Sequence, residues 1–244
     1  MVLAVIGGSG LKNFDGFELR RERPAETAYG EVSAPLLEFD TAHGPLFFLA
    51  RHGRQAHLPP HAVNYRANIR ALADVGVTDI ITVNIVGGIN PGMPPGAWVI
   101  PDQLIDYTWG REHTYYEGGA SGVEHVDFEA PFDPSLAGRL QQAAVRTGVS
   151  VQCVATYGCT QGPRLETAAE IERMSRDGCD IVGMTAMPEA ALARELGIRY
   201  AALCLVVNWA AGKGEQAADV AAMFAVVERE MPRAVAIVRN LMDN

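Results

Sequence analysis

The sequence is poor in basic residues and in cysteine, and it has no long apolar run. Its 244 residues include 20 Lys and Arg against 29 Asp and Glu, and the net charge of −9 gives no general attraction to nucleic acid or to an anionic membrane. The apolar run that follows Met1 is too short for a signal peptide or a membrane span. We therefore expect a cytoplasmic protein that has neither a nucleic acid nor a membrane as its partner.

The cysteines do not show the paired spacing that is typical of zinc sites. They are Cys153, Cys159, Cys179 and Cys204. Most of them lie in or beside apolar segments, which favours buried free thiols over disulfides or metal ligands. His57 and His61 are four residues apart, but Pro59 and Pro60 between them prevent a helical pair of ligands. We expect no metal site.

Apolar runs alternate with segments of helical periodicity, and this pattern predicts an α/β protein. The chain is 48% hydrophobic, enough for a large core, and its length fits one domain over residues 1–244. Strands are expected at 2–6, 45–50, 80–86, 97–101, 151–156, 181–184 and 200–207, and helices at 64–74, 133–147, 188–196 and 216–241. A capping box at Thr167–Glu170 predicts one more helix, and Pro232 should kink or interrupt the last one.

Residues 106–132 form a long segment without clear periodicity. The segment is rich in aromatic residues and glycine. A loop of this length inside a compact protein usually has a function, so we expect it either to cover a pocket or to pack against a neighbouring subunit.

Polar residues follow several of the predicted strands. In open α/β sheets ligands bind beyond the carboxyl ends of the strands, so Met184, Thr185 and Asn208 should lie side by side at the mouth of a pocket. The turn 7–10, with sequence GGSG, suits either a phosphate held by backbone N–H groups or an ordinary tight turn. The segment 51–55, with sequence RHGRQ, suits either a bound oxyanion or a basic surface cluster.

Six strand-end motifs, in this order along the chain, resemble those of the trimeric nucleoside phosphorylase family, especially its methylthioadenosine phosphorylase branch. They are GGSGL, RHGRQ, VGGIN, QGPRLET, GMTAMPEA and VVNWAAG. The resemblance implies a single domain with a central twisted mixed sheet flanked by helices, and a homotrimer with active sites near subunit boundaries. It also implies phosphorolysis of a purine nucleoside, with inorganic phosphate as co-substrate and no metal or organic cofactor.

The resemblance also implies roles for individual residues. Phosphate would be held by Ser9, Arg51, His52, Asn84, Thr185 and the backbone of Ile85. The nucleoside would contact Met184, Asn208, Trp209 and Ala210, and His125 would reach the pocket of the neighbouring subunit. Catalysis would fall to Asn208, Thr185 and His52. Against the methylthioadenosine branch, the chain departs at Ser9 and Asn84, which replace threonines, at Ile85, which replaces a small residue, and at Val207, which replaces a hydroxyl residue.

Two further positions bear on specificity. The pair Glu166 and Asn208 matches the oxopurine branch, because a carboxylate can accept the ring N–H of hypoxanthine and an amide can donate to its carbonyl. At the ribose 5′ end, Val220 stands where enzymes for ordinary oxopurine nucleosides carry a histidine, and Met223 and Phe224 follow one turn on. Such an apolar pocket favours a methylthio group, unless these residues are simply core residues of the last helix. The expected substrate is S-methyl-5′-thioinosine. The alternatives are an inosine or guanosine phosphorylase, a methylthioadenosine phosphorylase, and a nucleoside-binding sensor without activity.

Overall fold

The computed structural model describes residues 1–8, 10, 11, 14, 17–215 and 219–243. The strands are β1 (Leu3–Gly7), β2 (Glu18–Arg23), β3 (Glu26–Thr27), β4 (Gly30–Glu31), β5 (Leu36–Thr41), β6 (Gly44–Ala50), β7 (Asp79–Gly88), β8 (Trp98–Ile100), β9 (Gln103–Asp106), β10 (Val151–Cys153), β11 (Thr156–Cys159), β12 (Ile181–Gly183) and β13 (Arg199–Trp209). The helices are α1 (Tyr65–Asp74), α2 (Pro134–Arg146), α3 (Ala168–Arg176), α4 (Ala186–Glu195) and α5 (Val220–Met242), with short 3-10 turns at Pro60–Ala62 and Gly119–Ser121.

One large mixed sheet forms the centre of the molecule, which confirms the predicted fold class. Its main path runs β10-β8-β13-β7-β1-β6-β5-β2, and β9, β11 and β12 continue it beside the end of β7. Strands β1, β6, β7 and β13 are mutually parallel, whereas β5 and β2 continue the sheet in antiparallel fashion. The carboxyl ends of the four parallel strands therefore meet at one edge of the sheet.

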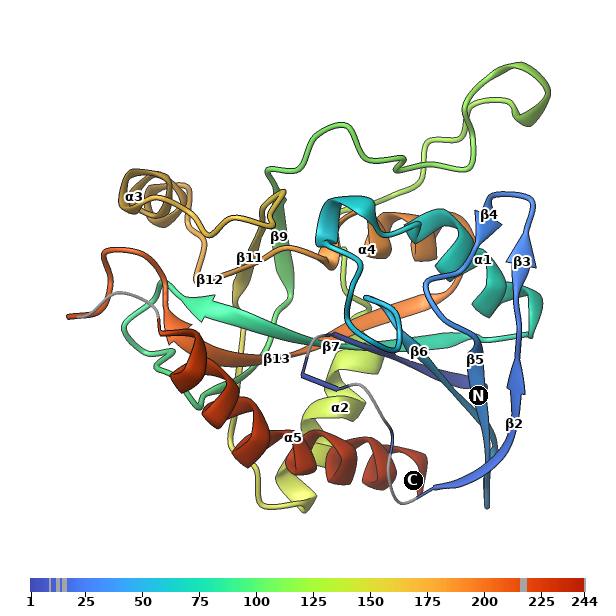
Figure 1. Ribbon diagram of the computed structural model, residues 1–244, viewed down its shortest axis with the longest axis horizontal. Coiled ribbons are helices and arrows are strands. Elements are labelled where there is room, and N and C mark those ends of the chain that lie inside the picture. Colours follow the sequence, from blue (N-terminus) through green and yellow to red (C-terminus); the bar gives the residue numbers. More distant parts are fainter. Residues whose placement is uncertain (9, 12–13, 15–16, 216–218, 244) are drawn as a thin grey trace.

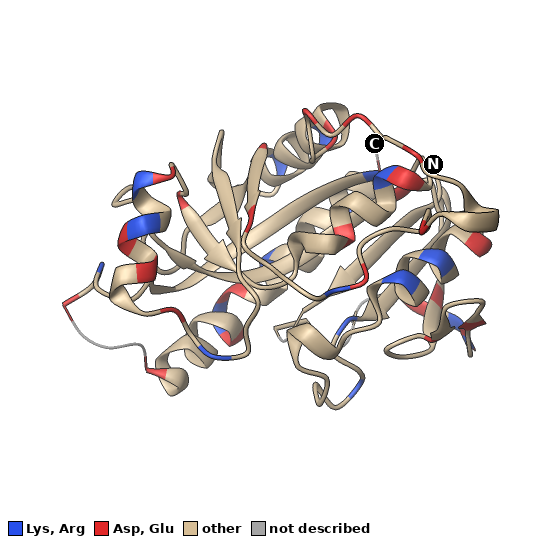
Figure 2. Cartoon of the chain, turned by 90° about the horizontal axis from the view of Figure 1, so that it is seen from above, with Lys and Arg blue, Asp and Glu red and all other residues tan. Residues whose placement is uncertain are grey.

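Helices cover both faces of this sheet. In Figure 1, α1 and α4 lie on one side, α2 and α5 lie on the other, and α3 stands apart beside β11 and β12. Acidic and basic residues are interspersed over the outer helices and loops (Figure 2). No helix among the described residues is both long enough and apolar enough to cross a membrane.

Helix starts follow local signals in the sequence. Asn64 and Asp133 cap α1 and α2 with their side chains, and Thr167 and Glu170 form the predicted capping box of α3. Gly197 follows α4 with φ +67°, the left-handed conformation expected at its end. The last helix runs unbroken through Pro232, although its axis changes direction along its length (Figure 1). Pro232 therefore does not interrupt α5.

Three strand predictions are wrong in detail. The segment 151–156 is not one strand, because Val154 adopts φ +65° and separates β10 from β11. Strand β13 continues two residues beyond Val207, through a register shift between Val206 and Asn208. The strands expected at 181–184 and 200–207 are not neighbours in the sheet; β12 lies antiparallel to the end of β7, and β13 pairs with β7 in parallel from Asp79 to Gly88.

Candidate active site

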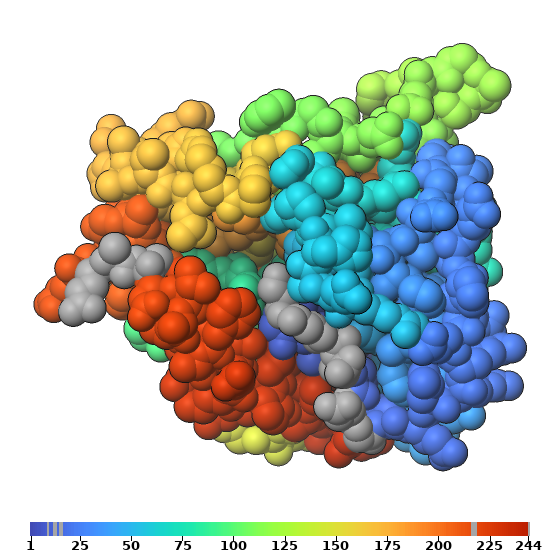
Figure 3. Space-filling model, viewed as in Figure 1, coloured from blue at the N-terminus to red at the C-terminus, as the bar shows by residue number. Residues whose placement is uncertain are grey.

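A cavity of about 750 Å³ opens where the parallel strands end. Its floor comes from β7 and β13, and its walls come from the segments after β6, β11 and β12 and from the start of α5. Segments far apart in the sequence, coloured cyan, yellow and red, surround this hollow on one face of the molecule (Figure 3). The cavity therefore forms only when these segments, which are distant in the sequence, are brought together by folding.

Most of the residues expected at the site line this one cavity. They are Arg51, His52, Asn84, Ile85, Glu166, Met184, Thr185, Asn208, Trp209 and Ala210. Ser9 lies outside the described residues, although the adjacent Gly8 lines the cavity. Arg54, from the same segment 51–55, pairs with Glu22 at the surface and does not join Arg51 and His52 at the cavity wall. Exposed His125 lies in the long loop and does not line the cavity of its own chain.

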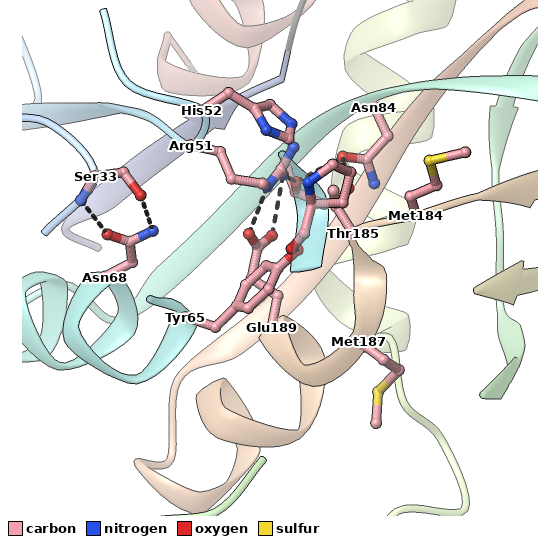
Figure 4. A network of polar contacts seen from close by, with 12 residues as sticks. Ser33, Arg51, His52, Tyr65, Asn68, Asn84, Met184, Thr185, Met187 and Glu189 are labelled. Carbon is pink, nitrogen blue, oxygen red and sulfur yellow. Dashed lines mark hydrogen bonds and ion pairs between the residues drawn. The ribbon is translucent and has the colours of Figure 1, made fainter. Parts of the chain in front are cut away.

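Arg51 is buried at the end of β6 and held by a carboxylate that the sequence did not single out. Its Nε and Nη2 atoms donate to the two oxygens of Glu189, at 2.6 and 3.1 Å (Figure 4). The Tyr200 hydroxyl donates to the same carboxylate at 2.9 Å. Burial alone would lower the pKa of Arg51, but pairing with Glu189 outweighs it, and the pKa lies above its usual value.

The remaining nitrogen of Arg51 is next to the turn after β1. A Cβ atom built on Gly8 would lie 3.1 Å from Nη1 and 3.0 Å from the Val83 carbonyl oxygen, so a side chain there would crowd both. Glycine thus allows the backbone to approach the guanidinium closely. An Arg51 N–H group that has no hydrogen bond to a described residue and a backbone turn at the same cavity wall suit an oxyanion.

A chain of hydroxyl and amide contacts continues from Arg51 across β7. Nη2 of Arg51 donates to the Thr82 hydroxyl, which donates to Oδ1 of Asn84 at 3.0 Å. The Thr185 hydroxyl lies 3.4 Å from the same oxygen. Nδ2 of Asn84 is buried and makes no hydrogen bond within the described part of the chain. Asn84 thus leaves a donor unused, which fits a ligand rich in acceptors.

His52 has one ring nitrogen fixed by the backbone. Its Nδ1 lies 2.8 Å from the Leu58 carbonyl oxygen, which can only accept, so Nδ1 carries the proton. Burial first, and then the charge of Arg51, lower the pKa of His52. His52 is therefore neutral at pH 7, with Nε2 unprotonated.

The two residues expected to recognise the base come from different segments. Glu166 stands in the loop between β11 and α3, and its Oε1 accepts a hydrogen bond from the Thr160 hydroxyl at 2.6 Å. Asn208 follows the register shift in β13, and its Nδ2 donates to the Trp209 carbonyl oxygen at 2.7 Å. One N–H of that amide is thus used, and the other N–H and the oxygen remain available to a ligand.

Val220 does not line the cavity, contrary to the expectation from its position in the sequence. Its side chain is 60% exposed at the first turn of α5, whereas Met223, one turn later, lines the cavity. The two side chains lie one turn apart on α5, and at this register the helix directs Met223 toward the cavity and leaves Val220 in solvent. The apolar contact at this end therefore comes from Met223.

Arg111 is another buried residue that the sequence did not single out. It stands in the long loop and donates to the carbonyl oxygens of Met184 and Gln161, at 3.0 and 2.8 Å, and to further oxygens nearby. It thereby links the loop to the segments after β11 and β12. Its only signal was a basic residue in an otherwise aromatic segment.

Among the described residues, no group of three or more His, Cys, Asp or Glu side chains is placed to hold a metal ion.

Residues 2–243 match the Phosphorylase superfamily. The chain belongs to this superfamily. The resemblance of its strand-end motifs to nucleoside phosphorylases is thereby confirmed.

Curated members of the superfamily are similar to this chain over most of their length. A probable S-methyl-5′-thioinosine phosphorylase of Pseudomonas syringae pv. tomato is 52% identical over 212 residues, which is 87% of this chain and 86% of the relative. A 6-oxopurine nucleoside phosphorylase of Pyrococcus furiosus is 46% identical, over 86% of this chain and 80% of the relative.

A superfamily member of known structure has the same fold. Methylthioadenosine phosphorylase from Schistosoma mansoni, solved with adenine, superposes with a TM-score of 0.94 at 29% identity, over 100% of this chain and 91% of that one. The mixed sheet with flanking helices is thus the phosphorylase fold.

Proposed function

We propose that this phosphorylase superfamily member cleaves S-methyl-5′-thioinosine with inorganic phosphate, giving hypoxanthine and 5-methylthioribose 1-phosphate. A phosphate oxygen forms a bond to C1′ of the ribose while the bond from C1′ to N9 of the base breaks. The electron pair of that bond leaves with the base, which then takes up a proton. Positive charge builds on the ribose and negative charge on the base, so fixed groups on both sides lower the barrier.

Phosphate would bind between Arg51, His52, Thr185, Asn84 and the backbone of Ile85. Nη1 of Arg51 and Nδ2 of Asn84 support this placement, since both are donors at the cavity wall and neither hydrogen-bonds to a described residue. Ser9 would add a hydroxyl from the first turn. No cofactor is required in this reaction, because phosphate itself is the nucleophile.

The choice of an oxopurine depends on one observation. Glu166 and Asn208, from separate segments, line the same cavity as Arg51 and Thr185. We propose that Glu166 accepts the ring N–H of hypoxanthine and that Asn208 donates to the base carbonyl and stabilises the leaving base, with Trp209 and Ala210 beside them. With adenine, Glu166 would face a lone pair, and each mispaired buried group costs on the order of 1–3 kcal/mol.

The methylthio end of the substrate would contact Met184 and Met223. The thioether of Met223 at this end of the cavity suits a methylthio group better than a hydroxyl. The relatives named as 6-oxopurine nucleoside phosphorylases keep an inosine phosphorylase as the second candidate.

We further propose that the enzyme is a cytoplasmic homotrimer. His125 would then reach the pocket of a neighbouring subunit, in keeping with its exposed position on the long loop. A trimer should elute at about three times the mass of the 26.2 kDa chain in size-exclusion chromatography with light scattering.

Release of free base distinguishes the candidates. The protein is incubated with phosphate and, separately, with S-methyl-5′-thioinosine, inosine and S-methyl-5′-thioadenosine, and the bases are separated by chromatography. We expect kcat/KM to be highest for S-methyl-5′-thioinosine, with no release when phosphate is omitted. A preference for S-methyl-5′-thioadenosine would contradict the roles of Glu166 and Asn208, and binding without turnover would favour a sensor.

A further inference from the structure

The carboxylate of Glu166 is held by a single protein donor. The Thr160 hydroxyl lies 2.6 Å from Oε1, a length typical of a hydroxyl that donates to an ionised carboxylate. No other described residue donates to Glu166, and its second oxygen, Oε2, is without a hydrogen bond. Glu166 itself lines the cavity.

Thr160 itself is fixed from both sides. Its backbone N–H donates to the Gly183 carbonyl oxygen at 2.8 Å, one residue beyond the paired ends of β11 and β12. Its carbonyl oxygen accepts from Arg111 at 3.3 Å. The position of the hydroxyl is therefore set by the sheet and by a buried guanidinium, whereas Glu166 stands six residues further along the same loop and is tied back to this point by the Thr160 hydroxyl.

We infer that Thr160 is a positioning residue for base selection: its hydroxyl holds Oε1 of Glu166 so that Oε2 faces the ring N–H of an oxopurine. This inference rests on the role of Glu166 in the proposed function. The Gly183 carbonyl oxygen, 3.3 Å from the same hydroxyl, is its other acceptor. A hydroxyl has one proton, so the Thr160 hydroxyl donates either to Glu166 or to the Gly183 carbonyl oxygen, and the shorter distance favours Glu166.

Replacing the hydroxyl by a methyl group tests the inference with little change in shape. In Thr160→Val, Glu166 loses its donor, and kcat/KM for S-methyl-5′-thioinosine should fall about tenfold, while the value for S-methyl-5′-thioadenosine stays within about twofold. Thr160→Ser keeps the hydroxyl and should restore the oxopurine preference. A merely structural role would lower both substrates together and would not distinguish serine from valine.

Thr156→Val is the matched control. Thr156 lies on β11, the strand that leads directly to Thr160, and is half-buried, but its hydroxyl makes no hydrogen bond with the described residues and it does not line the cavity. This variant should keep the wild-type ratio of the two substrates. If Thr156→Val changes the ratio as much as Thr160→Val does, the effect belongs to the strand and the inference fails.

A double-mutant comparison separates this inference from the proposed function. In a Glu166→Ala background, Thr160→Val should change the substrate ratio no further, because the hydroxyl no longer has the side chain that it would hold. Additive effects would overturn the inference while leaving the proposed function standing. A wild-type preference for S-methyl-5′-thioadenosine would overturn the proposed function first, before any variant is compared.

Discussion

At the scale of single residues, the site depends on a buried ion pair more than on any surface charge. Arg51 and Glu189 are 1% and 0% exposed, and the guanidinium uses two of its nitrogens on the carboxylate. The positive charge that faces the cavity is therefore largely compensated from behind. What the pair provides is a fixed direction for Nη1, which suits a preorganised phosphate site.

Replacing Glu189 by glutamine should affect both stability and phosphate use. Loss of the negative partner leaves a buried guanidinium uncompensated, which costs about 3–5 kcal/mol of unfolding free energy. The KM for phosphate should rise about tenfold or more, since Arg51 loses its fixed orientation. Chemical denaturation and steady-state kinetics measure the two effects.

The exposed pair of Glu22 and Arg54 provides the control for this change. Its side chains are 46% and 52% exposed, and Glu22→Gln should cost less than about 1 kcal/mol and leave the KM for phosphate unchanged. Equal losses in the two variants would mean that burial of the Arg51 pair has no special effect.

At the scale of helices and strands, local signals predicted more than non-local ones. Helices α1, α2 and α3 begin where the sequence predicted, because each start is capped by a side chain that reaches the backbone three residues on. Strand β2 gave no such signal, since its sequence ELRRER is exposed and charged. Its arginines pair with Glu38 on β5, a contact that exists only once the two strands are side by side.

The register of α5 decides which side chain meets the ribose 5′ end. Met223 lines the cavity and Val220 is mostly exposed, so Met223→Gln should lower kcat/KM for S-methyl-5′-thioinosine about tenfold relative to inosine. Val220→Gln, on the same helix, should keep both values within about twofold. If the Val220 variant changes the preference and the Met223 variant does not, the original sequence interpretation was right.

The junction between β10 and β11 contains a strained residue that a glycine should relieve. Val154 has φ +65° and is 79% exposed, a conformation that costs a β-branched residue about 1–2 kcal/mol. Val154→Gly should therefore raise the unfolding free energy by about 1 kcal/mol, partly offset by the greater freedom of the unfolded chain. The midpoint of chemical denaturation measures the change.

The same substitution in a helix should have the opposite sign. Val145 is 67% exposed on α2, and Val145→Gly should lower the unfolding free energy by about half a kcal/mol because glycine is the poorer helix former. A loss of stability in both variants would mean that Val154 is not strained.

At the scale of the whole molecule, the sequence predicted which strand ends meet but not what supports them. Arg51, Thr185 and Asn208 line one cavity because their strands end at the same region of the sheet. Glu189 and Arg111 could not be placed in the same way, since Glu189 holds Arg51, 138 residues away, and Arg111 holds Met184, 73 residues away. A buried partner has no spacing signature, because only the tertiary fold brings it close.

Protonation of His52 should make both the stability of the protein and its binding of an anion depend on pH. The pKa of His52 is lowered by burial and by Arg51, so between that value and about 6.5 the unfolded chain binds more protons than the folded one. The stability that neutral His52 contributes is thus present at pH 7 and above and is lost as the pH falls through this window. A bound dianion should raise the pKa of His52 again and oppose the loss.

Sulfate is a suitable probe, because unlike phosphate its charge does not change between pH 8 and pH 6. If His52 contacts the anion, sulfate binding takes up a proton, and the rise in Tm caused by a fixed sulfate concentration should grow as the pH falls. Affinity should strengthen by at most about tenfold per pH unit for one proton. In His52→Gln the sulfate effect should be independent of pH; an equal pH dependence in that variant and the wild type would place the titrating group elsewhere.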